Sequence, residues 1–141
     1  MLTFCFFVDT ISTTTMEYTN TDANPISIDN YPWLYEINDK FTGLIDGKWM
    51  LFCPKDIFDD EWRALRKLYN EGKLEGVRSM KCSTNFNNPR ASNSSSVFIL
   101  YCDNSENEQH IMDIGQNIAK GIDCTKFVNM KVNPYIYYKT D

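Results

Sequence analysis

Residues 47–52 read GKWMLF, a short apolar run that is followed at once by Cys53 and Pro54. A run of this length, closed by a proline that cannot donate a hydrogen bond to a sheet, is typical of a buried strand. We therefore predict that the first strand of a sheet spans Lys48 to Cys53. The patterns that follow it decide what this strand packs against.

Two later segments have the period of an amphipathic helix. Apolar residues recur at helical spacing over residues 58–69 and again over residues 111–118. Three acids at residues 59–61 favour the positive end of the first helix, and SENE at residues 105–108 is a capping-box pattern before the second. Gly72 stands where the first helix is expected to end.

Strand-like runs fill most of the remaining sequence after residue 53. They cover residues 74–84, 97–102, 127–131 and 135–139. The resulting order of β, α, β, β, α, β, β predicts an α+β fold, in which two main helices pack on one face of a curved antiparallel sheet. The most apolar run, residues 97–102, is expected to be a central strand.

The N-terminal part has a different composition. Residues 9–30 are rich in Thr, Asn, Asp and Ser and show no sustained period. We predict a mostly disordered leader over residues 1–30, with Met16 as an alternative start of translation, and a single α+β domain over residues 31–141. The aromatic cluster Tyr31–Tyr35 is expected to dock on that domain.

Length and charge limit the classes of function. The 141 residues are about one domain's worth, with 43% hydrophobic and 14% aromatic residues. A net charge of −5 argues against the broad basic face that non-specific nucleic-acid binding usually requires. A small local site for one phosphorylated ligand is compatible with this charge.

The cysteines and the N-terminus favour a cytoplasmic location. Five cysteines occur without any C-x-x-C spacing, which is typical of reduced and buried thiols. The apolar start at residues 1–8 is short and lacks a basic region, so we expect neither a secretory signal nor a membrane partner.

The sequence offers few residues for catalysis. Its one histidine, His110, lies early in the second predicted helix, where a structural role is the favoured interpretation. There is no glycine-rich phosphate loop and no acidic metal-binding loop. We expect no metal and no cofactor, and an enzyme is the less favoured alternative.

Aromatic and basic residues on the predicted strands are the remaining candidates. Trp49 and Trp33 could form a stacking surface for a base, and lysines could hold a phosphate. Strand alternation turns Met80 toward the helices and Lys81 toward the opposite, open face. The candidate ligand-binding residues are Lys48, Trp49, Arg78, Lys81, Ser83 and Lys139.

Several segments, in order and spacing, resemble the basophilic-leukaemia-expressed protein family of eukaryotes. They are GKWMLF at 47–52, DDEW at 59–62, EGKL at 71–74, MKCST at 80–84 and YYKTD at 137–141. The resemblance implies the fold of the cap-binding translation initiation factor 4E, with helices on the convex face of a curved sheet and a concave face able to hold a ligand.

Three functions follow from these patterns. The first is a non-enzymatic domain that binds a nucleotide, RNA or another phosphorylated ligand on the concave sheet face. The alternative is a protein–protein interaction domain that uses the Tyr31–Tyr35 cluster. An enzyme of the phosphoesterase type is the least favoured.

Overall fold

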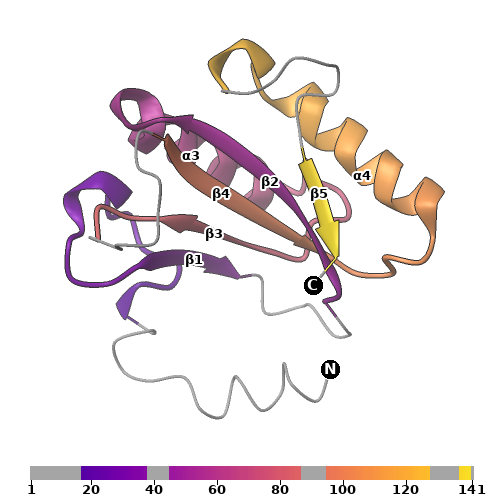
Figure 1. Ribbon diagram of the computed structural model, residues 1–141, viewed down its shortest axis with the longest axis horizontal. Coiled ribbons are helices and arrows are strands. Elements are labelled where there is room, and N and C mark those ends of the chain that lie inside the picture. Colours follow the sequence, from indigo (N-terminus) through magenta and orange to yellow (C-terminus); the bar gives the residue numbers. More distant parts are fainter. Residues whose placement is uncertain (1–16, 38–44, 87–94, 128–136, 141) are drawn as a thin grey trace.

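The computed structural model describes residues 17–37, 45–86, 95–127 and 137–140 (Figure 1). Among these residues the strands are β1 (Trp33–Ile37), β2 (Gly47–Pro54), β3 (Ser79–Ser83), β4 (Ser95–Cys102) and β5 (Tyr137–Thr140). The helices are α3 (Lys55–Asn70) and α4 (Glu108–Gly121), with two 3₁₀ turns, η1 (Pro25–Ser27) and η2 (Cys124–Lys126).

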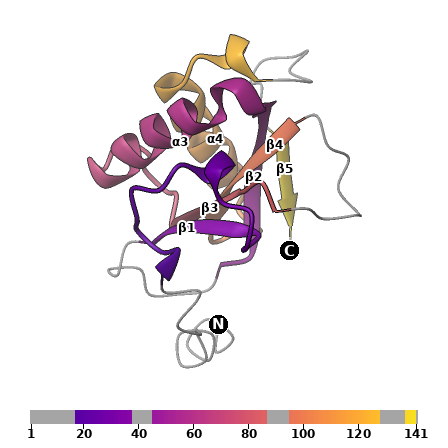
Figure 2. The same cartoon turned by 90° about the vertical axis from the view of Figure 1, so that its left-hand side faces the viewer.

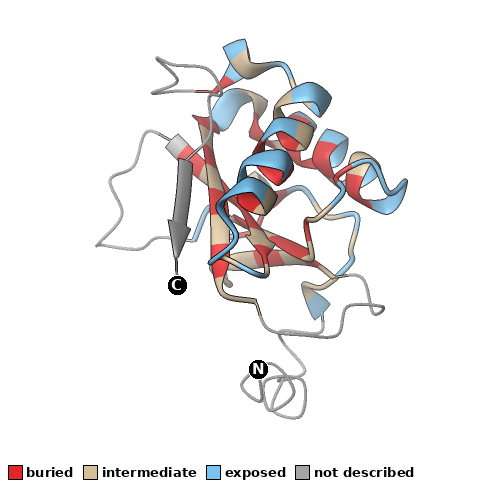
Figure 3. Ribbon diagram, turned by 90° about the vertical axis from the view of Figure 1, so that its right-hand side faces the viewer, coloured by how far each residue is buried: buried red, intermediate tan, exposed pale blue. Residues whose placement is uncertain are grey.

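The strands form one antiparallel sheet in the order β1-β3-β4-β2-β5. The apolar strand β4 lies in the middle, as predicted. Both long helices lie on the same side of the sheet (Figure 2). Their buried residues face the sheet and their outer sides are exposed (Figure 3). The predicted α+β fold is thus confirmed.

The strand β2 shows how the sheet separates its two faces. Trp49, Leu51 and Cys53 are buried, and the residues between them are only partly covered. This is the alternation expected of a strand with helices on one side. Above these residues the rings of Phe58 and Phe98 stack with their centroids 4.1 Å apart, so the core lies between β2, β4 and α3.

Helix α3 begins at Lys55, before the acids at residues 59–61 that were expected at its N-terminal end. Pro54 both ends β2 and precedes the first helical residue, so no loop separates the two elements. The acids at residues 59–61 therefore lie in the second turn, and the role predicted for them at the helix terminus is wrong. Asp59 instead accepts a hydrogen bond from the Ile26 backbone N–H at 2.9 Å.

The end of α3 agrees with its predicted position. Gly72 has a φ of +76°, which glycine adopts without the strain of a side chain. Its N–H donates to the Tyr69 carbonyl at 3.1 Å, and the Lys73 N–H donates to the Leu68 carbonyl at 2.9 Å. This pair of bonds is the Schellman motif, which satisfies carbonyls at a helix end.

Residues 74–78 form a turn rather than the start of a strand. Gly76 has a φ of +94°, and a Cβ there would lie 2.4 Å from the Ile114 Cγ1 atom of α4. The turn thus packs tightly on α4, and β3 begins only at Ser79. The strand predicted over residues 74–84 is therefore too long at its N-terminal end.

Helix α4 has the predicted apolar stripe but a different cap. Ile111, Ile114 and Ile118 are all buried. The capping side chain is that of Asn107, which accepts a hydrogen bond from the His110 N–H at 3.1 Å. The capping box expected at Ser105 is wrong, because the helix begins at Glu108.

Residues 17–30 pack on the domain, in contrast to the predicted disordered leader. Pro25 and Ile28 are buried, and η1 contacts α3. Tyr35 in β1 accepts and donates backbone hydrogen bonds with this segment, each 2.8 Å long. The Tyr31–Tyr35 cluster is thus largely a strand. Residues 1–16 lie outside the described part of the chain.

Two further predictions fall near the C-terminus. A strand is present at β5, within the predicted residues 135–139 and one residue beyond them. Residues 128–131 of the other predicted strand lie outside the described residues. Within the described ranges, no helix has both the length and the apolarity to cross a bilayer.

Candidate binding face of the sheet

The face of the sheet turned away from the helices, here called the open face, carries the residues that alternate with the core. No helix among the described residues covers this face (Figure 2). On β1, β3, β4 and β2 its members are, in that order, Trp33, Tyr35 and Ile37; Ser79, Lys81 and Ser83; Val97, Ile99 and Tyr101; and Lys48, Met50 and Phe52.

The open face carries lysines but no carboxylate on these strands. The strands β1 to β5 contain one acidic residue, Glu36, which lies on the helix side with its side chain 4% exposed. This is notable for a chain with a net charge of −5. Among the strand residues, the charged groups of the open face are therefore lysines, which attract an anionic ligand.

Lys81 lies between two aromatic rings. Its Nζ is 4.0 Å from the centre of the Trp33 ring and 5.7 Å from the centre of the Tyr101 ring. A cation at these distances is attracted by the negative face of each ring. The prediction that Lys81 and Ser83 point away from the buried Met80 is confirmed.

Lys48 is close to this cluster by register. It is paired directly with Tyr101 on β4, and on its other side with Lys139 on β5. Directly opposed residues of an antiparallel pair are about 5 Å apart. The register thus sets two of the predicted lysines side by side, next to the ring that Lys81 approaches.

Trp49 does not belong to the open face. It is 4% exposed and is part of the hydrophobic core with Leu51. Sequence analysis grouped it with Lys48, but consecutive residues of a strand point to opposite faces. The predicted role of Trp49 in stacking on a ligand at this face is therefore wrong, and Trp33 is the tryptophan that lies there.

Arg78 lies beyond the end of the open face and forms an ion pair there. Its guanidinium Nη2 lies 3.1 Å from the Asp103 carboxylate, and the same carboxylate lies 3.2 Å from Nε2 of His110. His110 is partly buried, and the structural role expected of it stays a prediction. Arg78 precedes β3, so the structure does not group it with Lys81.

Ser83 lies on the open face and also stabilises the pairing of two strands. Its Oγ accepts a hydrogen bond from the Val97 N–H at 3.0 Å, which continues the pairing of β3 with β4 by one more residue. The hydroxyl proton can still be donated to a ligand oxygen. Ser83 is therefore a supporting residue of the site.

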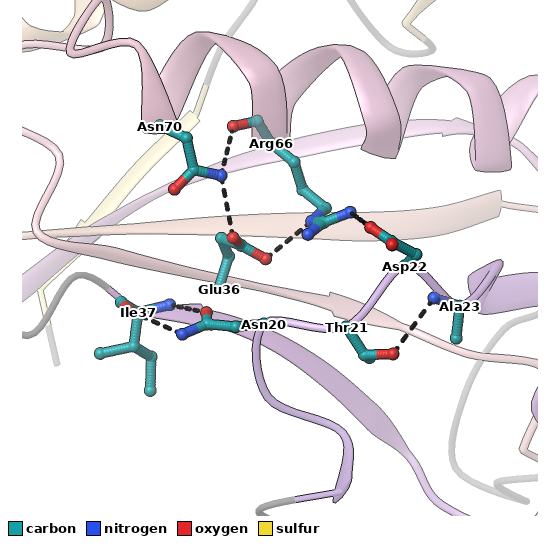
Figure 4. A network of polar contacts seen from close by, with 8 residues as sticks. All are labelled: Asn20, Thr21, Asp22, Ala23, Glu36, Ile37, Arg66 and Asn70. Atoms are coloured by element: carbon teal, nitrogen blue, oxygen red, sulfur yellow. Dashed lines mark hydrogen bonds and ion pairs between the residues drawn. The ribbon is translucent and has the colours of Figure 1, made fainter.

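A buried ion pair holds β1, and with it Trp33, against α3. The Arg66 Nε lies 2.7 Å from Glu36 Oε1, and the Asn70 amide donates to Glu36 Oε2 at 2.9 Å (Figure 4). Arg66 also reaches Asp22 at 3.1 Å, and these carboxylates raise the pKa of Arg66 against the lowering effect of its burial. The network fixes the strand that presents Trp33.

The edge of β1 is covered by a side chain. The amide of Asn20 both accepts from the Ile37 N–H at 2.8 Å and donates to the Ile37 carbonyl at 3.1 Å (Figure 4). Asn20 has a φ of +56°, an uncommon conformation that asparagine tolerates better than most residues. These bonds satisfy backbone groups that an edge strand would otherwise leave open.

The thiols of the described core serve in packing. Cys53, Cys82 and Cys102 are buried and free, as predicted. Burial raises the pKa of Cys53 and of Cys102 to about 12, and it also raises that of Cys82. Such thiols are poor nucleophiles. In the described ranges no group of three or more His, Cys, Asp or Glu residues is arranged to hold a metal.

Sequence analysis missed Tyr101 as a member of the site. Residues 97–102 are so uniformly apolar that the sequence does not show which of them face outward. Two facts supply the orientation: Tyr101 pairs with Lys48, and the alternate residues Phe98, Leu100 and Cys102 are buried. Alternation counted from a known inward residue would have identified Tyr101.

The chain matches no protein-family model and no curated protein. The resemblance to the basophilic-leukaemia-expressed protein family therefore stays a prediction, as does the implied likeness to initiation factor 4E.

Proposed function

We propose that this protein is a non-enzymatic binding domain whose open face binds an aromatic, phosphorylated ligand, a nucleotide or RNA. The observation that carries the proposal is the position of Lys81 between Trp33 and Tyr101 on a face without strand carboxylates. Aromatic rings offer stacking surfaces for a base, and an ammonium group beside them can meet a phosphate.

The absence of a carboxylate from the described strand positions of the open face favours a binding role over chemistry there. General acid–base catalysis needs a group that exchanges a proton near neutral pH. Lysine, serine and tyrosine side chains are the polar groups of the described open face, and His110 is paired with Asp103 elsewhere. The face can therefore hold and orient a ligand, which is what we propose it does.

Thermal unfolding in the presence of candidate ligands tests this proposal. The purified protein is heated with mononucleotides, cyclic nucleotides and short RNA in turn. A ligand present at a hundred times its Kd adds about 2.7 kcal/mol to the free energy of unfolding, so the midpoint temperature should rise. Lys81→Gln should remove most of the rise, whereas Lys120→Gln, at an exposed position of α4, should leave it intact.

The competing function is protein–protein interaction through the Tyr31–Tyr35 cluster. Much of this cluster is occupied within the domain, because Leu34 is buried and the Tyr31 ring stacks on Tyr18 with centroids 5.0 Å apart. A protein partner lost on Trp33→Ala but retained on Lys81→Gln, together with no thermal shift by any nucleotide or RNA, would replace our proposal with this one.

A further inference from the structure

Aromatic and basic residues form one row across the open face. The row is Trp33 on β1, Lys81 on β3, Tyr101 on β4 and Lys48 on β2, and the strand register extends it to the position of Lys139 on β5. We call it the diagonal row. It includes three of the lysines predicted as ligand-binding, and it adds the two aromatic residues of the open face that Lys81 approaches.

The strand register gives the direction of the row. Tyr35 pairs with Lys81, so Trp33 is displaced from Lys81 by two residues along β1. Lys81 pairs with Ile99, so Tyr101 is displaced by two residues along β4 in the same direction of the sheet. From Tyr101 the row runs straight across through the paired positions of Lys48 and Lys139.

The length of the row follows from strand geometry. Four steps between neighbouring strands, each about 4.8 Å wide, combine with two displacements of two residues at about 3.3 Å per residue, so the row spans roughly 20–25 Å. One mononucleotide can contact only part of such a row. A ligand that uses all five positions must be an elongated chain with repeated aromatic and anionic groups.

We infer that the diagonal row is the track of a single-stranded nucleic acid of about four nucleotides, which is the lower end of the site sizes of single-strand binding folds. This inference rests on the proposed function and specifies its ligand. Bases stack on Trp33 and Tyr101, and phosphates meet Lys81 and Lys48, beyond which the strand register places Lys139 next in line. The combination of rings and cations suits a single strand, because its bases are free to leave their neighbours and stack on protein.

The charge of the chain limits this binding to a short segment. The described acids lie on the helices, turns and the N-terminal segment and on the helix side of β1, while the row contains three lysines and no acid in its sequence. A longer polyanion would extend beyond the row toward a surface of net negative charge. Affinity should therefore rise with length only until the row is filled.

A length series tests the inference. Competition against a labelled oligoadenylate is measured by fluorescence anisotropy for adenosine monophosphate and for single strands of two to eight nucleotides. We expect affinity to rise at least about ten-fold from the mononucleotide to the tetranucleotide and to change less than about two-fold beyond it. RNA and DNA versions of the series show which of the two single strands the row takes, and preference for either supports the inference.

The salt dependence of the tetranucleotide provides a second readout. Each phosphate contact on a single strand contributes about 0.7 to the slope of log K against log salt concentration, so three lysines predict a slope of about −2. Lys48→Gln, Lys81→Gln and Lys139→Gln should each reduce its magnitude by about 0.7. Lys120→Gln is the matched control and should leave the slope unchanged.

The outcomes separate this inference from the proposed function. Equal affinity for the mononucleotide and the tetranucleotide, or equal affinity for single-stranded and duplex RNA, would overturn the inference while the proposed function stands. Binding of neither mononucleotide nor oligonucleotide would overturn both. The lysine variants alter residues within strands, so the melting temperature of each variant is measured first. Only the salt slope of a variant that is folded decides the result.

Discussion

At the scale of single residues, the two glycines of the segment between α3 and β3 have different roles. Both Gly72 and Gly76 have positive φ, so a side chain strains the backbone at either position. They differ in space, because a Cβ at Gly72 meets no atom within 4 Å, whereas one at Gly76 would meet Ile114 at 2.4 Å. The comparison separates backbone strain from a steric clash.

We predict that Gly72→Ala lowers the free energy of unfolding by about 1 kcal/mol, the cost of a left-handed conformation for a residue with a Cβ. Gly76→Ala should cost about 3 kcal/mol, because displacement of Ile114 is added to the same strain. Urea denaturation of both variants measures the difference. Equal costs for the two variants would contradict the close packing of this turn on α4.

The core thiols give the protein a dependence on alkaline pH. Burial, followed by the charge of Asp103, raises the pKa of Cys102 from 9.0 to about 12. The folded state thus holds the thiol proton more tightly than the unfolded chain. The resulting stability is fully present below pH 9 and is lost as pH rises from 9 toward 12.

We predict that Cys102→Ala reduces the fall in unfolding free energy across pH 9–12 by up to about 1.4 kcal/mol per pH unit. The comparison concerns slopes, so a constant cost of the substitution in the core cancels. Chemical denaturation at a series of pH values measures both slopes. Identical slopes for the variant and the unchanged protein would show that Cys102 titrates alike in the folded and unfolded states.

At the scale of secondary structure, β1 contains a buried charged residue, Glu36, that is stabilised by partners on α3. Glu36 is buried on the helix side of the sheet, where Arg66 and Asn70 of α3 both contact its carboxylate. Removing one partner of such a pair leaves the other charge in a poorly solvated place. The strand that presents Trp33 should therefore be sensitive to this one side chain.

We predict that Glu36→Ala lowers the free energy of unfolding by about 2 kcal/mol, since Arg66 and Asn70 lose their buried partner while Arg66 keeps its contact with Asp22. Lys73→Ala, which removes an exposed ion pair with Glu71, should stay within about 0.5 kcal/mol of the unchanged protein. Urea denaturation of both variants tests this. A cost below 1 kcal/mol for Glu36→Ala would mean that the network contributes little to holding β1.

The same residue explains why sequence reasoning missed β1. Strands β2 and β4 were predictable because their buried positions are apolar. In β1 the second buried position is Glu36, so the sequence lacks the apolar–polar alternation typical of a strand. The partners of Glu36 come from α3, about thirty residues later. A tertiary ion pair of this kind leaves no local signal in the sequence.

The candidate site could be predicted only in part for a related reason. Local alternation correctly separated Lys81 from Met80, because both lie on one strand. The grouping of Lys81 with Trp33 and Tyr101 depends on which strands are neighbours and in what register. Strand order is a property of the whole chain, so the sequence alone did not provide it.

At the scale of the whole molecule, the sheet separates two environments. The helix side holds the core, including Trp49 and Trp62, each nearly inaccessible. The open face holds Trp33 with Lys81 and has no strand carboxylate. An acidic protein thereby keeps one face suited to an anionic ligand, and this separation is the basis of the proposed function.

The three tryptophans report on the two faces independently. The chain contains Trp33, Trp49 and Trp62 and no others, so their indole N–H groups give three signals in a ¹H–¹⁵N correlation spectrum. The most direct measurement is a titration of the labelled protein with a single-stranded tetranucleotide. We predict that the Trp33 indole signal shifts progressively, while those of Trp49 and Trp62 stay in place. A bound tetranucleotide that leaves the Trp33 signal unmoved would contradict it, and so would the absence of any shift at saturating concentrations of mononucleotide and oligonucleotide.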